Sequence, residues 1–248
     1  MDTTTYVALS QQLVLERDLD VTANNLANMN TTAFKLETLM MQTDPVDLPS
    51  KGGGPPQVNF VLDGGVARDF SAGSMKETDG PFDLAIQGDG FFTINTPAGP
   101  RYTRDGRFSL NDQGQLVTRN GDPVDGGGGP ITIDPTKGPV HIAGDGTISQ
   151  STITGAQTVG KISVVSFASL SGLSKEGNGL YNNVSNVQPQ PSTTAALHQG
   201  MLESSNVEPM SQMIHLVRVT AAYTTISEML VNISNMSRTA VDRLGQVT

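Results

Sequence analysis

The chain has 248 residues, a net charge of −9 at pH 7, a hydrophobic fraction of 36%, 27 glycines and no cysteine. This length allows one large domain or two modest ones. The acidic balance argues against a nucleic-acid partner, because phosphates require a basic face. The lack of cysteine excludes zinc–thiolate sites, disulfides and cysteine nucleophiles.

The N-terminus carries neither the basic start nor the apolar run of a secretory signal. We therefore expect either a cytoplasmic protein or one exported by a route that leaves it uncleaved. No stretch is apolar over 18 residues, so no membrane insertion is expected.

Apolar residues recur at helical spacing over residues 3–35. Leu9 and Leu13 begin a stripe that continues through Leu19, Leu26 and Met29, in the rhythm of a coiled-coil seam. An amphipathic helix packed on its own domain would give the same stripe, and this alternative stays open. We predict an N-terminal helix within residues 1–40.

Asparagines gather towards the end of this stripe, at Asn24, Asn25, Asn28 and Asn30. Asparagine is a poor helix former, but its carboxamide donates and accepts hydrogen bonds and so suits closely packed helices. Helix termination is the rival explanation for Asn28 and Asn30.

The middle of the chain changes character. Residues 41–74 are expected to be a linker or extended region, because they contain Gly52-Gly53-Gly54-Pro55-Pro56. From about Val58 apolar residues alternate, and Asp-Gly dipeptides typical of tight turns recur through residue 146. We predict a central, mainly antiparallel β domain over residues 75–185, followed by a second linker over residues 186–205.

Residues 206–248 return to helical spacing, with Val219, Ile226 and Ile233 seven residues apart. A helix of about 39 residues would be roughly 58 Å long, too long to bury its apolar surface on one compact domain. Between Val219 and Ser237 the only charged residue is Glu228. Exposed helical faces normally carry many charges, so other helices are expected to contact this one on several sides.

The predicted fold class is therefore α+β, with long terminal helices that pair as a coiled coil around the apolar stripes. The predicted assembly interface consists of Leu9, Leu13, Leu19, Asn24, Asn25, Leu26, Asn28, Met29, Val219, Tyr223, Ile226, Met229, Leu230, Ile233, Met236 and Leu244.

Motifs that would indicate catalysis are missing from the sequence. The three histidines form no H-E-x-x-H motif, and no phosphate loop, dinucleotide fingerprint or G-x-S-x-G elbow is present. A carboxylate pair could in principle serve a glycosidase, but nearly every aspartate adjoins glycine, proline or asparagine, where a turn role explains it. We expect no enzyme activity, no cofactor and no metal.

Several segments resemble the bacterial flagellar rod and hook proteins. Residues 23–35 (ANNLANMNTTAFK) resemble the N-terminal signature of that family. Residues 83–92 (DLAIQGDGFF) and 102–108 (YTRDGRF) resemble its central strand and the following hairpin, and residues 203–207 (ESSNV) resemble the entry into its C-terminal helix. The signature usually ends Thr-Gly-Phe-Lys, so Ala33 is a departure that makes a glycine-only backbone angle unlikely at that position.

This resemblance implies a structural subunit that assembles helically into the basal-body rod, the drive shaft that transmits torque. Length favours the proximal-rod member over the distal-rod member. The implied partners are copies of itself, other rod proteins and the flagellar type III export apparatus, and the implied location is the rod in the periplasmic space. The rival from another class is a secreted fibre or adhesin with coiled-coil ends.

Overall fold

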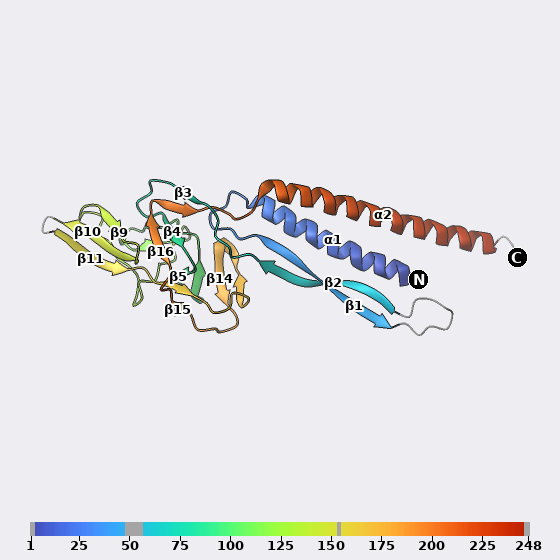
Figure 1. Ribbon diagram of the computed structural model, residues 1–248, viewed down its shortest axis with the longest axis horizontal. Helices are drawn as coiled ribbons and strands as arrows, with labels where there is room; N and C mark the ends of the chain where they lie inside the picture. Colours follow the sequence, from blue (N-terminus) through green and yellow to red (C-terminus); the bar gives the residue numbers. More distant parts are fainter. Residues whose placement is uncertain (1–2, 48–56, 153–154, 246–248) are drawn as a thin grey trace. The chain divides into compact units, whose positions relative to one another are not determined.

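The computed structural model describes residues 3–47, 57–152 and 155–245 (Figure 1). The chain divides into two compact units. The terminal unit comprises the described parts of Met1–Met29, Leu36–Asp69 and Val207–Thr248, and the central unit comprises those of Asn30–Lys35 and Phe70–Asn206. The fold class is α+β, as predicted, because two helices accompany strands whose pairings are all antiparallel in the described chain.

The terminal unit contains helix α1 (Thr3–Ala27), helix α2 (Pro209–Gly245) and strands β1 (Glu37–Asp47) and β2 (Gln57–Arg68). The two helices run antiparallel, since Gln12 bonds to Tyr223 whereas Asn25 bonds to Gln212. Figure 1 shows them side by side along much of α1.

Helix α1 is shorter than the predicted helical segment of residues 1–40. It ends at Ala27, directly before Asn28. The Asn28 backbone N–H and its Nδ2 both donate to the Asn24 carbonyl oxygen, at 3.1 and 2.9 Å. Local bonds of asparagine side chains to the backbone favour helix ends, which supports helix termination as the explanation for Asn28.

Residues 41–74 were predicted to be a linker or extended region. Within that range, residues 41–47 and 57–68 lie in an antiparallel two-stranded hairpin, so for them the extended alternative is correct and the linker alternative is wrong. Strands β1 and β2 pair from Glu37 opposite Arg68 to Asp47 opposite Gln57. The alternation that begins at Val58 is the pattern of such a strand. Gly64 and Gly65 lie in a β-bulge opposite Met40, where the sequence suggested a turn. The segment Gly52–Pro56 lies outside the described residues.

The central unit is built from short strands between frequent turns. A six-stranded sheet has the order β13-β14-β6-β5-β12-β15, a three-stranded sheet has the order β11-β10-β9, and three strand pairs join β16 to β4, β17 to β3 and β7 to β8. The strand bounds are β3 Met75–Glu77, β4 Leu84–Gln87, β5 Phe91–Thr96, β6 Gly99–Thr103, β7 Ser109–Leu110, β8 Leu116–Val117, β9 Val140–Ile142, β10 Thr147–Thr152, β11 Gly155–Lys161, β12 Val164–Ser166, β13 Leu173–Lys175, β14 Leu180–Asn183, β15 Gln190–Pro191, β16 Ala196–Gln199 and β17 Met201–Glu203.

Strand β5 separates two cores because successive side chains of a strand point to opposite faces. Phe92 is buried in an aliphatic cluster with Leu84, Ile86 and Ile94. Phe91 belongs instead to an aromatic cluster that contains Tyr102 and Tyr181 and packs against Phe70 and Phe167.

The predicted linker over residues 186–205 is also wrong, because it contains three strands. Strands β16 and β17 pair with β4 and β3, and β15 pairs with β12. Proline suggested a linker, but Pro191 lies in β15, an edge strand of its sheet. An edge strand can accommodate a residue without an N–H donor.

The backbone of Ala33 also differs from the expectation for this position. Its φ angle is +57°, in the left-handed region that glycine adopts most easily. The residue is buried, and its N–H donates to the Glu203 carbonyl oxygen at 2.8 Å. The surrounding contacts therefore hold an alanine in a conformation that costs about 1–2 kcal/mol.

We expect Ala33→Gly to raise the free energy of unfolding of the central unit by about 0.5 kcal/mol. Relief of the left-handed conformation exceeds the loss from a more flexible unfolded chain and a missing methyl group. Urea unfolding followed by the near-ultraviolet dichroism of Tyr102 and Tyr181 measures the change.

The matched control is Ala156→Gly, at an exposed position in β11 with an ordinary φ angle. It should lower the free energy of unfolding by about 0.5–1 kcal/mol. Changes of the same sign at both alanines would contradict strain at Ala33.

Candidate assembly surface

Few apolar side chains of the two helices are buried. They are Ala8, Val14 and Val21 on α1 and Val219 on α2. Polar side chains join the helices: Gln12 Nε2 donates to Tyr223 Oη at 3.1 Å, and His215 Nε2 lies 3.1 Å from Asp18 Oδ1. The chain thus covers only part of the apolar surface of its two helices.

The predicted interface residues fall into three groups in this structure. Large apolar side chains of the predicted stripes are exposed, with Leu13 at 57% and Met236 at 65%. The exposed group is Leu9, Leu13, Asn24, Met229 and Met236; the half-buried group is Leu19, Leu26, Asn28, Met29, Tyr223, Ile226, Leu230 and Ile233; and the buried group is Asn25 and Val219. The side chain of Leu244 lies outside the described residues.

On α1 the buried face is offset from the predicted stripe. Ala8 and Val14 turn towards the rest of the terminal unit, whereas the neighbouring Leu9 and Leu13 turn outwards. One residue corresponds to about 100° around a helix, so a shift of one position moves a side chain to another face. The larger side chains are the ones left in solvent.

Further exposed apolar residues were missed by the heptad reading. They include Val217, which is 70% exposed. The others are Met210, Met213, Ile214 and Val231 on the helices, and Met40, Met41 and Leu62 on the hairpin. Tyr6, at the start of the predicted stripe on α1, is also exposed. The signal in the sequence was that α2 is apolar on several sides, which is typical of a helix buried all round.

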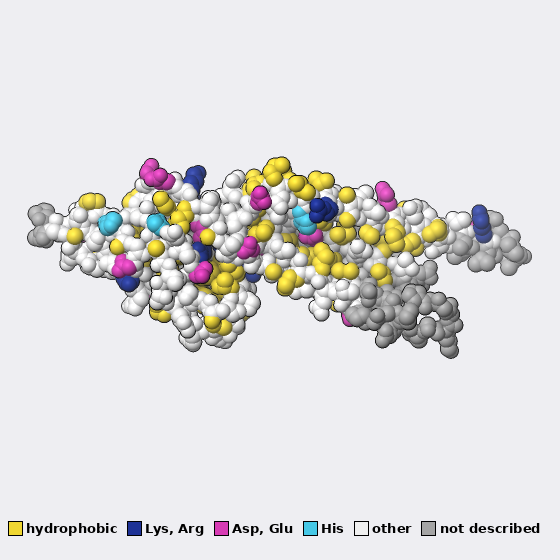
Figure 2. Space-filling model, viewed as in Figure 1, with side chains coloured by type: hydrophobic (Ala, Val, Ile, Leu, Met, Phe, Trp, Pro, Cys, Tyr) yellow, Lys and Arg dark blue, Asp and Glu magenta, His cyan; other side chains and the backbone are white. Residues whose placement is uncertain are grey.

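Figure 2 shows hydrophobic side chains following both helices on the face in view, with few charged side chains among them. Many exposed apolar side chains along two neighbouring helices are uncommon on a protein that acts alone, so this surface is a candidate interaction site.

Asn25 is the predicted residue with the most completely defined role. Its Nδ2 donates to the Glu37 carbonyl oxygen at 2.7 Å and to Gln212 Oε1 at 3.2 Å, while its Oδ1 accepts from the Glu37 N–H at 3.0 Å. The carboxamide therefore joins α1 to α2 and to the start of β1 within one chain. Its hydrogen-bonding capacity is used inside the terminal unit.

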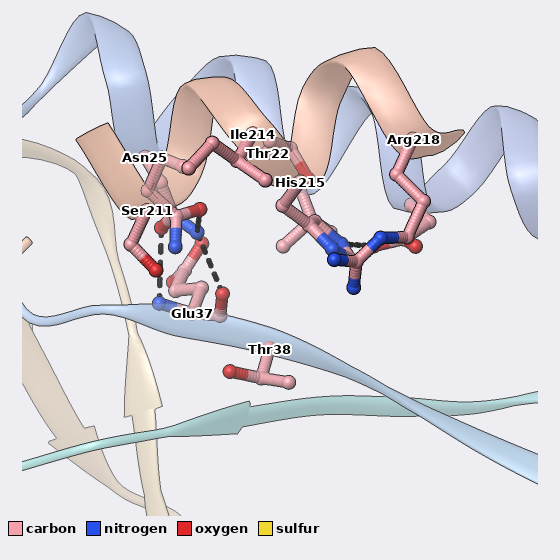
Figure 3. A pocket seen from close by; sticks show the side chains of 11 residues that line it. Thr22, Asn25, Glu37, Thr38, Ser211, Ile214, His215 and Arg218 are labelled. Atoms are coloured by element: carbon pink, nitrogen blue, oxygen red, sulfur yellow. Dashed lines mark hydrogen bonds and ion pairs between the residues drawn. The ribbon is translucent and has the colours of Figure 1, made fainter. Parts of the chain in front are cut away.

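A polar cavity of about 280 Å³ lies beside Asn25, between α1, α2 and β1. Figure 3 shows His215, Arg218, Glu37 and Thr38 around it. Its carboxylates have partners: Asp18 accepts from His215, and Glu37 forms an ion pair with Arg68 at 2.9 Å. The described residues hold no cluster of histidine and acidic side chains that could bind a metal.

Aspartates elsewhere serve as turn residues. The backbone N–H and hydroxyl of Thr147 donate to Asp145 at 3.0 and 2.8 Å, and these bonds lower the pKa of the Asp145 carboxyl. Thr136 binds Asp134 in the same way, with its hydroxyl hydrogen bond as the main cause of the lowered pKa. These carboxylates are occupied in turns.

Neither helix, over its described residues, is long and apolar enough to cross a membrane.

Three family models match this chain in the order expected from the sequence. Residues 7–35 match the flagella basal body rod protein family, residues 85–150 match the D1 domain of the flagellar hook protein FlgE/F/G, and residues 198–243 match the C-terminal region of the flagellar basal body rod FlgEFG proteins.

Full-length relatives carry related names. The chain is 49% identical over 248 residues to the flagellar basal-body rod protein FlgF of Caulobacter vibrioides, covering 100% of both chains. It is 38% identical to FlgF of Mesorhizobium japonicum, covering 99% of each, and 32% identical to FlgG of Bacillus subtilis, covering 94% of this chain and 98% of the relative. The chain therefore belongs to the flagellar basal-body rod proteins, and within that family it is FlgF-like.

Proposed function

We propose that this rod subunit assembles helically with copies of itself and with other rod proteins into the shaft that transmits torque. The observation that carries this proposal is the large apolar surface left exposed on α1 and α2, including Leu13 and Val217. Covering apolar surface contributes roughly 25 cal/mol per Å². Helices of neighbouring subunits are well suited to supply that cover.

The length of α2 supports the same arrangement. Its 37 residues, Pro209–Gly245, correspond to about 56 Å, whereas α1 has 25 residues, Thr3–Ala27. Part of α2 therefore extends past its partner helix, where residues such as Met236 are exposed. We propose coiled-coil pairing of α1 with α2, and further helix packing between subunits along this extension.

We assign the terminal segments, about residues 1–40 and 206–248, to the inner tube of the rod, with the central unit outside it. Subunits related by a helical operation use different patches on each side, so the contact repeats without closing. Dense helix packing resists shear, because protein interiors deform little. Torque transmission would then be a property of the packed helices.

The family also suggests the route and the place of assembly. We propose export through the flagellar type III apparatus and assembly in the periplasmic space. In the unassembled subunit the terminal segments lack their partners, and they are proposed to fold on joining the rod, when burial between subunits offsets the loss of conformational entropy.

Circular dichroism of the isolated monomer should show much less helix than α1 and α2 would give when folded, whereas the assembled state should show both. The near-ultraviolet signal of Tyr102 and Tyr181 serves as the control, because the central unit is expected to stay folded in both states. A monomer whose ends are fully helical and resistant to protease would contradict folding on assembly.

Leu13→Asp should abolish swimming, because a carboxylate would be buried between packed helices at a cost of several kcal/mol. The stability of the central unit should change by less than about 0.5 kcal/mol, since Leu13 is exposed in the lone subunit. Complementation of a strain that lacks the gene provides the measurement.

Gln11→Asp is the matched control, since Gln11 is an exposed polar residue on the same helix. The change in charge is the same, and swimming should be retained. Normal swimming of the Leu13→Asp strain would count against an assembly role for this face.

A further inference from the structure

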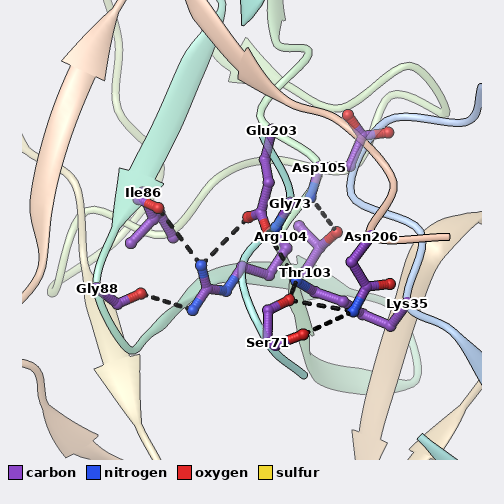
Figure 4. A network of polar contacts seen from close by, with 10 residues as sticks. All are labelled: Lys35, Ser71, Gly73, Ile86, Gly88, Thr103, Arg104, Asp105, Glu203 and Asn206. Carbon is purple, nitrogen blue, oxygen red and sulfur yellow. Dashed lines mark hydrogen bonds and ion pairs between the residues drawn. The ribbon is translucent and has the colours of Figure 1, made fainter. Parts of the chain in front are cut away.

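Three charged side chains that are far apart in the sequence are buried together in the central unit (Figure 4). Lys35 Nζ lies 2.6 Å from Glu203 Oε1, and Arg104 Nη1 lies 3.2 Å from Glu203 Oε2. Their side chains are 0%, 4% and 1% exposed for Lys35, Arg104 and Glu203. We call these three residues the charge clamp.

Hydrogen bonds to the backbone complete the clamp. Lys35 Nζ donates to the Ser71 carbonyl oxygen at 2.6 Å, and the Gly73 N–H donates to Glu203 Oε1 at 3.0 Å. Arg104 Nη2 donates to the Gly88 carbonyl oxygen at 2.7 Å. The clamp therefore fixes backbone segments as well as side chains.

Backbone hydrogen bonds run through the same place. The Ala33 N–H donates to the Glu203 carbonyl oxygen, and the Ser204 N–H donates to the Ser74 carbonyl oxygen, both at 2.8 Å. Asn206 Nδ2 donates to the carbonyl oxygen of Ser71 at 3.2 Å. Segments 33–35, 71–74 and 203–206 are thus tied to one another.

These segments adjoin the places where the chain passes between its two units, at residues 29–30, 35–36, 69–70 and 206–207. Segment 33–35 follows α1, and segment 203–206 precedes α2. We call the end of α1 and the start of α2 the roots of the two helices. The clamp therefore holds the chain close to both roots.

The physical chemistry of the clamp makes this holding cooperative. A buried charge is tolerated when it is paired and hydrogen-bonded, and removing one partner leaves the others uncompensated. Lys35 and Glu203 consequently reach their buried sites together. Ion pairs of this kind specify a unique arrangement more than they add net stability.

We propose that the charge clamp keeps the roots of α1 and α2 together in the unassembled subunit, so that pairing of the two helices on assembly closes a short loop. This inference rests on the proposed folding of the termini during assembly. The connection from Ala27 to Pro209 through the contact between Phe34 and Asn206 spans about ten residues. A short connection of this kind costs less entropy to close than one whose ends are free to move apart.

The first measurement concerns the monomer. Since the chain has no cysteine, Asn30→Cys and Ser204→Cys give two defined sites for spin labels. Their distance distribution should be narrow in the otherwise unchanged chain and broad in the Lys35→Met variant. A broad distribution in the unchanged chain, or a narrow one in Lys35→Met, would overturn the proposal.

The second measurement concerns assembly. When expression is induced in a strain lacking the gene, swimming cells should appear at least tenfold more slowly with Lys35→Met. Lys137→Met is the matched control, because Lys137 forms an exposed ion pair with Asp134 at 3.7 Å; it should behave like the unchanged chain. Unaltered kinetics with Lys35→Met would refute the clamp while leaving the rod function intact, whereas failure of the unchanged chain to restore swimming would refute the function itself.

Near-ultraviolet dichroism of Tyr102 and Tyr181 checks that each variant keeps a folded central unit. If Lys35→Met does not fold, Asn206→Ala provides the test, because it removes two hydrogen bonds to Ser71 without stranding a buried charge. It should broaden the distance distribution and slow the recovery of swimming; no effect on either would overturn the proposal.

Discussion

Helix α1 packs against α2 and against the hairpin β1–β2, yet large apolar side chains of both helices stay exposed. Small side chains such as Ala8 and Val14 take buried positions, and Leu9 and Leu13 remain in solvent. The hydrophobic effect favours the covering of apolar area that is exposed to water. In the proposed assembly, neighbouring rod subunits cover this exposed area.

The central unit has the opposite character. Its aliphatic cluster lies on one face of β5 and its aromatic cluster on the other, and both consist of buried residues. Its turn aspartates accept hydrogen bonds from residues of the same chain. Such a unit can fold on its own contacts. The charge clamp lies in this self-sufficient unit and takes in the chain segments next to both helices. In our proposal, the folded central unit thereby orders the chain segments that adjoin α1 and α2.

The periodicity of apolar residues was enough to predict two terminal helices and antiparallel strands in the middle of the chain. The scarcity of charged residues on α2 could be read directly from the sequence. Periodicity did not predict that α1 ends at Ala27, or that Ala33 has a positive φ angle where its N–H donates to the Glu203 carbonyl oxygen. On α1, heptad spacing identified the apolar residues, but it did not predict that Ala8 and Val14 are buried while Leu9 and Leu13 are exposed. The partners of Lys35 and Asn25 are Glu203 and Gln212, which are far away in the sequence, and no local sequence pattern predicts these contacts.

The edge strands of the six-stranded sheet have one more consequence. Strand β15 has two residues and includes Pro191, and strand β13 has three and ends at Lys175. Short edges that carry proline or lysine are poor templates for strand addition. In the proposed shaft, where many copies are crowded together, these two edges of the six-stranded sheet would therefore resist strand addition between neighbouring subunits.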